Sequence, residues 1–80
     1  MKKHRIIVKK LGRENFYGVA DDVKNTITID PRLRPRTHLE VLIHEKLHLL
    51  QHDWSETKVT KTAKELRDLL WDAGYRMVKQ

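Results

Sequence analysis

The sequence predicts an α+β fold in which a small, mostly antiparallel three-stranded sheet is followed by two helices. Within residues 1–30, three short segments carry alternating or β-branched apolar side chains, and polar turns separate them. After Pro35 the apolar spacing becomes that of amphipathic helices, and a break at residues 52–54 divides this part in two. Eighty residues suffice for one domain, so we treat residues 1–80 as a single domain.

The strands are expected at His4–Lys10, Phe16–Ala20 and Thr26–Asp30. The third is the clearest, because threonine and isoleucine alternate along it as they do in a strand with one buried face. Pro31 and Pro35 then end the sheet region, since proline has no amide donor and biases the preceding residue away from helix.

The first helix is expected to begin at a capping box formed by Thr37 and Glu40 and to run to about Gln51. Its apolar arc is broad, which predicts a central helix that packs on the sheet and on the second helix at once. Lys46 lies within this arc, so its stem should follow apolar neighbours while its amine reaches water. The residues of the arc are Leu39, Leu42, Ile43, Leu47, Leu49 and Leu50.

The second helix is expected to have Ser55 as its N-cap and Gly74 as its C-terminal stop. Trp71 and Tyr75 should close the bottom of the core. The predicted core stripe of this helix consists of Val59, Ala63, Leu66, Leu69, Leu70 and Ala73.

Composition narrows the class of protein. The chain has no cysteine, which excludes thiol catalysis and cysteine zinc fingers and suits a reducing cytoplasm. The apolar run Ile6–Val8 is too short for a signal peptide or a membrane span, so we expect an unexported, cytoplasmic protein. A net charge of +6 attracts acidic partners, but no groove-reading motif accompanies it, so we do not expect nucleic acid as a partner, although the charge does not exclude it.

The sequence His44-Glu45-Lys46-Leu47-His48 is a His-Glu-x-x-His motif inside the first predicted helix. Side chains four residues apart share a helix face, so His44 and His48 can hold one zinc ion while Glu45 acts as a base beside it. A catalytic zinc site has three protein ligands and leaves the fourth position to water. The alternative is a helix that carries two surface histidines.

The third ligand has four candidates after the motif: His52, Asp53, Glu56 and Glu65. Two turns of straight helix would separate His52 from His44 by about 12 Å, which one ion does not span. Glu65 should face solvent, whereas Glu56 borders the apolar stripe and can face the first helix. Glu56 also fits a second role, because Asp53 and Glu56 together have the spacing of a capping box.

Three motifs together resemble the gluzincin-type zinc metallopeptidases, and most closely the very small metallopeptidases encoded in phages and prophages. The resemblance covers roughly residues 16–76. Gln51 and Trp54 stand where the metzincin motif requires glycine and histidine. The three motifs are His44-Glu45-Lys46-Leu47-His48, Ser55-Glu56-Thr57-Lys58-Val59 and Leu70-Trp71-Asp72-Ala73-Gly74-Tyr75-Arg76.

The resemblance implies a zincin-like fold with one Zn²⁺ per chain, held by His44, His48 and Glu56, and Glu45 as catalytic base. It also implies action in the cytoplasm of a bacterial host. The chain departs from the family pattern at Lys46, since zincin motifs usually carry uncharged residues there.

The function expected from the sequence is therefore zinc-dependent hydrolysis of peptide bonds in a peptide or protein substrate. The substrate would add to the edge of the Phe16–Ala20 or the Thr26–Asp30 strand. The alternative is a zinc-stabilised, small basic binding module that regulates a partner protein without efficient turnover. An oxyanion-stabilising residue is not assigned, and its candidates are His38, His52, Tyr75 and Arg76.

Overall fold

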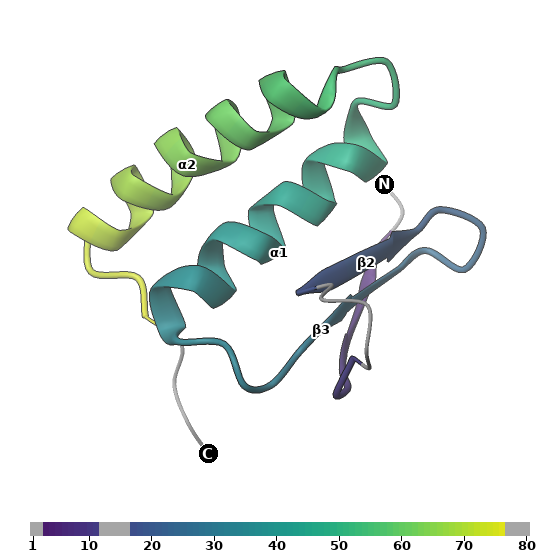
Figure 1. Ribbon diagram of the computed structural model, residues 1–80, viewed down its shortest axis with the longest axis horizontal. Helices are drawn as coiled ribbons and strands as arrows, with labels where there is room; N and C mark the ends of the chain where they lie inside the picture. The colour runs from purple at the N-terminus through teal and green to yellow at the C-terminus, as the bar shows by residue number, and fades with distance from the viewer. Residues whose placement is uncertain (1–2, 12–16, 77–80) are drawn as a thin grey trace.

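The computed structural model describes residues 3–11 and 17–76 of the chain (Figure 1). The central helix α1 lies between the sheet and the second helix α2, so the molecule has three layers (Figure 1). The predicted α+β class is confirmed. The elements in chain order are β1 (Arg5–Val8), β2 (Gly18–Asp21), β3 (Thr26–Ile29), α1 (Pro35–Leu50) and α2 (Glu56–Asp72).

The sheet is mixed, with strand order β1-β3-β2. β2 and β3 form the expected antiparallel pair, but β1 pairs with β3 in parallel. β1 and β2 therefore lie on opposite sides of β3. As a result β3 is central and paired on both sides, so the prediction that the Thr26–Asp30 strand could accept a substrate at its edge is wrong. β2 has a free edge.

The turn of the β2–β3 hairpin is held by Asp21. Its Oδ1 accepts hydrogen bonds from the backbone amides of Val23 and Lys24, both at 3.0 Å. Asn25 has a φ of 53°, a left-handed conformation that asparagine tolerates better than most residues. The polar turn expected from the sequence is thereby confirmed.

The core lies where α1 covers β3. Ile27 and Ile29 are 2% and 0% exposed, and Leu49 of α1 packs against them. Between the helices, Val59 and Ala63 of α2 are fully buried. The partly buried residues around the sheet-side cluster are Ala20, Leu33 and Leu42.

The predicted core stripe of α2 is only half correct. Val59 and Ala63 are buried, but Leu66, Leu69 and Ala73 are exposed, Leu69 at 64%. Because α1 separates α2 from the sheet, α2 packs against α1 alone among the described elements, and only a narrow line of its side chains is buried. Tyr75 is also 64% exposed, so the prediction that it closes the core is wrong.

The start of α1 differs from the prediction. The helix begins at Pro35, which takes a first-turn position where its missing amide hydrogen is not needed. Arg34 is the N-cap and makes no side-chain capping bond. The capping box predicted at Thr37 and Glu40 is therefore wrong, and the Glu40 carboxylate instead pairs with Arg67 of α2.

Both ends of α2 agree with the sequence. The Ser55 hydroxyl accepts a hydrogen bond of 3.1 Å from the backbone amide of Lys58, which confirms the N-cap. At the other end Gly74 has a φ of 95°, and the amides of Gly74 and Tyr75 bond back to the carbonyls of Trp71 and Leu70 at 3.0 Å. This pattern is a Schellman motif, which satisfies carbonyls that the helix end leaves free.

The chain leaving β3 is fixed by Asp30, which is only 3% exposed. Its carboxylate accepts hydrogen bonds from the Leu11 amide and from the backbone and guanidinium of Arg32. The hydrogen bonds from Arg32 hold the pKa of Asp30 well below its usual range. Asp30 therefore stays charged and ties the segment after β1 to the connection that leads into α1.

Lys46 lies on the sheet side of α1 and is partly buried, as its place in the apolar arc predicted. Its Nζ contacts Nδ1 of His4 instead of ending in water. Neither helix in residues 3–11 and 17–76 is long and apolar enough to cross a membrane.

Candidate metal centre

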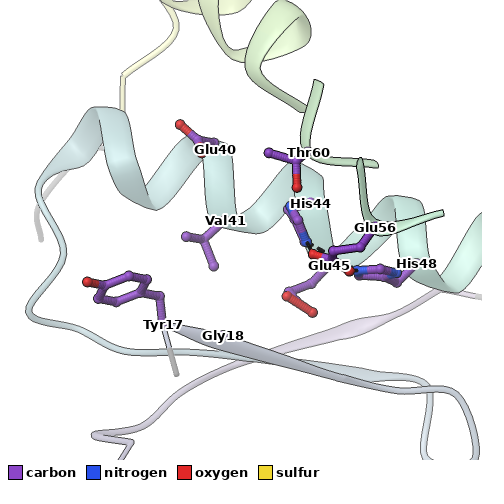
Figure 2. Close-up of a pocket in the computed structure, with 9 residues that line it drawn as sticks. All are labelled: Tyr17, Gly18, Glu40, Val41, His44, Glu45, His48, Glu56 and Thr60. Atoms are coloured by element: carbon purple, nitrogen blue, oxygen red, sulfur yellow. Dashed lines mark hydrogen bonds and ion pairs between the residues drawn. The ribbon is translucent and has the colours of Figure 1, made fainter. Parts of the chain in front are cut away.

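α1 presents His44 and His48 on the same face, one helical turn apart (Figure 2). Their Nε2 atoms are 3.1 Å apart, and the ring centroids are separated by 4.8 Å at an edge-on angle. Both side chains are partly buried, with exposed fractions of 19% and 32%. The helix therefore holds two imidazole nitrogens in nearly one place.

Glu56, the first residue of α2, meets both histidines (Figure 2). Its Oε1 lies 2.8 Å from Nε2 of His44, and its Oε2 lies 3.0 Å from Nε2 of His48. The short connection between the helices brings it there, and within it the Trp54 amide bonds to the Gln51 carbonyl at 3.2 Å. The prediction that Glu56 faces the first helix is confirmed.

The donor geometry fits a metal ion. One nitrogen from each histidine and one oxygen of Glu56 all lie within 4.8 Å of one another. Ligand atoms around a tetrahedral zinc are about 3.3 Å apart, given bonds of about 2.0–2.1 Å. Each Nε2 carries at most one proton, so it cannot donate well both to the Glu56 carboxylate and to the other imidazole. A cation between the three residues would instead accept a lone pair from each of them.

Glu45 projects toward β2, beside the three predicted ligands (Figure 2). Burial raises the pKa of its carboxyl, while the charges of His44 and His48 act in the opposite direction. Gly18 of β2 makes this placement feasible. A Cβ at Gly18 would lie 2.6 Å from Val41 Cγ1 and 3.2 Å from Glu45 Cγ, so the strand can approach α1 only without a side chain there.

These residues open into one cavity of about 420 Å³ between α1, α2 and the β2 edge. The predicted residues His44, Glu45, His48 and Glu56 all line it. Sequence reasoning missed the others, although Glu40 and Thr60 lie one helical turn from His44 and Glu56 and were in principle detectable by that spacing. The additional lining residues are Tyr17, Gly18, Glu40, Val41 and Thr60.

The remaining ligand candidates lie away from this cluster. His52 is 61% exposed and its Nδ1 is 3.8 Å from Asp22 Oδ2, while Glu65 is exposed as predicted. Asp53 is not the N-cap of α2, because Ser55 holds that position. The alternative in which Asp53 and Glu56 form a capping box is therefore wrong.

None of the four candidates for oxyanion stabilisation lines the cavity around His44, His48 and Glu56. His38, Tyr75 and Arg76 instead line a separate cavity of about 230 Å³ at the N-terminal end of α1. There the Arg76 guanidinium stacks 3.5 Å from the centre of the Trp71 ring, and burial lowers the pKa of His38.

Comparisons with known protein families, with curated proteins and with solved structures returned no match. The resemblance to small gluzincin-type metallopeptidases therefore stays a prediction from the three sequence motifs.

Proposed function

We propose that this protein is a zinc-dependent peptidase. One observation carries the proposal: two imidazole nitrogens and a carboxylate converge within 4.8 Å, and Glu45 stands beside them in the same cavity. Two histidines and a carboxylate are a common ligand set for zinc in hydrolases. His44, His48 and Glu56 would hold the ion.

Bound zinc would supply polarisation of the substrate carbonyl and would lower the pKa of a coordinated water to about 7. Glu45 would take a proton from the attacking water and pass it to the leaving amine. It does not belong to the converging group of donors, so it is free for this role.

The substrate would bind as an extended segment at the free edge of β2. Among the described strands, β2 pairs with β3 alone, and its first residue, Gly18, lines the cavity. Backbone hydrogen bonds to such an edge position a peptide without reading its side chains. The peptide would then cross the cavity in front of His44 and Glu45.

Replacement of Glu45 by glutamine tests the catalytic role. The wild-type protein should carry about one zinc per chain and cleave an unfolded protein substrate. Glu45→Gln keeps the size of the side chain and removes the base, so cleavage should fall by about 10²–10⁴-fold while zinc content and circular dichroism stay unchanged.

Two outcomes would contradict the proposal. A wild-type protein that takes up no zinc lacks the centre altogether. A zinc-loaded wild-type protein that cleaves nothing would instead support a zinc-stabilised binding module, and loss of zinc in Glu45→Gln would place Glu45 among the ligands.

A further inference from the structure

The cavity around His44, His48 and Glu56 continues onto the surface of α2. A second hollow of about 460 Å³ lies along this helix, and it shares Glu56 and Thr60 with the first. A chain that leaves the β2 edge and crosses the cluster would therefore next meet α2. The residues that line this second hollow are Glu56, Thr57, Thr60, Lys61 and Lys64.

Three acidic groups near this path already have partners. Glu56 contacts both histidines, and Glu40 pairs with the guanidinium of Arg67. Further along α2, Asp68 pairs with Arg67 and Arg36. Glu65 is exposed and unpaired among the described residues, but it does not line the second hollow. The only carboxylate among the described residues that line this hollow is therefore that of Glu56, which already contacts the histidines.

The basic groups of the second hollow have no such partners. Lys61 and Lys64 are exposed, and neither forms an ion pair with any residue in the described part of the chain. Lys58 differs from them, because its amine lies 4.3 Å from the centre of the Trp54 ring. Among the described residues that line the second hollow, the unpaired charge is thus positive and lies at Lys61 and Lys64.

We propose that Lys61 and Lys64 select substrates that carry acidic side chains on one side of the cleaved bond. This inference rests on the proposed peptidase function and adds a substrate class to it. An extended peptide places alternate side chains toward the same surface, so an acidic stretch can meet both amines at once. Positive charge beside the site also raises the rate of encounter with acidic chains, and salt weakens this effect.

The test uses two matched unstructured peptides, one with glutamates clustered at one end and the other with glutamines in their place. Binding is measured by fluorescence anisotropy with the zinc-loaded Glu45→Gln protein, so that cleavage does not interfere. Two exposed ion pairs predict about 3–20-fold tighter binding of the glutamate peptide at low salt. The combined replacement of Lys61 and Lys64 by glutamine should remove the preference.

The matched control replaces Lys9 and Lys10 by glutamine, which removes the same net charge just beyond β1, a strand that makes no contact with α2. This control should keep the preference. Equal binding of the two peptides, or an equal loss in the Lys9 and Lys10 control, would overturn the inference. Zinc uptake and cleavage of the glutamine peptide by the wild-type protein report separately on the proposed peptidase function.

Discussion

Glu56 connects the two helices through its side chain, since it starts α2 and contacts both histidines of α1. A carboxylate at this position is also favoured by the positive end of the helix dipole. The side chain itself is 69% exposed, so packing does not hold it in place. Its position therefore depends on what it contacts across the cleft.

Replacing Glu56 by alanine should weaken zinc binding by tenfold or more, because it removes one of the three predicted ligands. Replacing Glu65 by alanine is the matched control, since it deletes an exposed carboxylate from the same helix and should leave affinity unchanged. Competition with a chromophoric chelator measures both constants. A larger loss from Glu65→Ala would show that the wrong carboxylate has been assigned.

For single residues, the sequence predicts those positions that the geometry of one helix determines. His44 and His48 share a face because they are four residues apart on a helix, whatever the rest of the fold does. Tyr17 and Gly18 reach the same cavity only through the packing of β2 on α1, and no spacing in the sequence records that contact. The cavity wall opposite the motif was therefore not predictable.

The first turn of α2 carries both the N-cap of the helix and its contact with the histidines of α1. The Ser55 hydroxyl satisfies the Lys58 amide, and this turn carries Glu56 to the histidines. The sequence predicted this cap correctly, yet it misplaced the start of α1, where Pro35 begins the helix before the Thr37 box. Both signals were present, and a proline in the first turn outweighed a capping box that required the helix to start later.

Replacement of Ser55 by alanine should lower the free energy of unfolding by about 1 kcal/mol, the usual loss for an N-cap hydroxyl. Urea denaturation of the zinc-free protein measures this without a contribution from the metal. Thr57→Ala serves as the control, because it removes another exposed hydroxyl from the same turn and should leave stability equal or slightly higher. Similar losses in both variants would mean that Ser55 does not cap the helix.

The order of the strands in the sheet could not be predicted from the sequence pattern. Alternation of side chains identified the strands, but it does not specify on which side of β3 the first strand pairs. The order β1-β3-β2 depends on contacts between segments far apart in the sequence, such as those of β1 with β3. This order also leaves Ile6 and Val8 more than half exposed, because α1 covers β2 and β3 but not β1.

For the whole molecule, stability rests on few buried side chains. The largest fully buried ones are Ile27, Ile29 and Val59, and the described residues contain no cysteine that could form a disulfide. A core of this size supports only marginal stability in a small domain. A metal ion that joins α1 to α2 would therefore contribute a large part of the total.

Removal of zinc with a chelator should lower the melting temperature by about 10–20 °C. Free metal at 100 times its dissociation constant stabilises the fold by about 2.7 kcal/mol, and each kcal/mol shifts a domain of this size by about 4–8 °C. Differential scanning calorimetry with and without the chelator measures the change, and His48→Ala should show no response to it. Equal melting of the zinc-loaded and zinc-free wild-type protein would mean that packing alone holds the helices together.

α1 lies between the sheet and α2 both in the sequence and in the fold, so the elements can pack in the order in which they are synthesised. The strands leave the ribosome first, but the apolar face formed by Ile27 and Ile29 has no cover until α1 has followed. Glu56 emerges after α1, twelve residues beyond His44. The nascent chain can therefore bury the apolar face of its sheet before Glu56 can reach the two histidines, so the proposed metal centre can form only after α2 has begun to emerge.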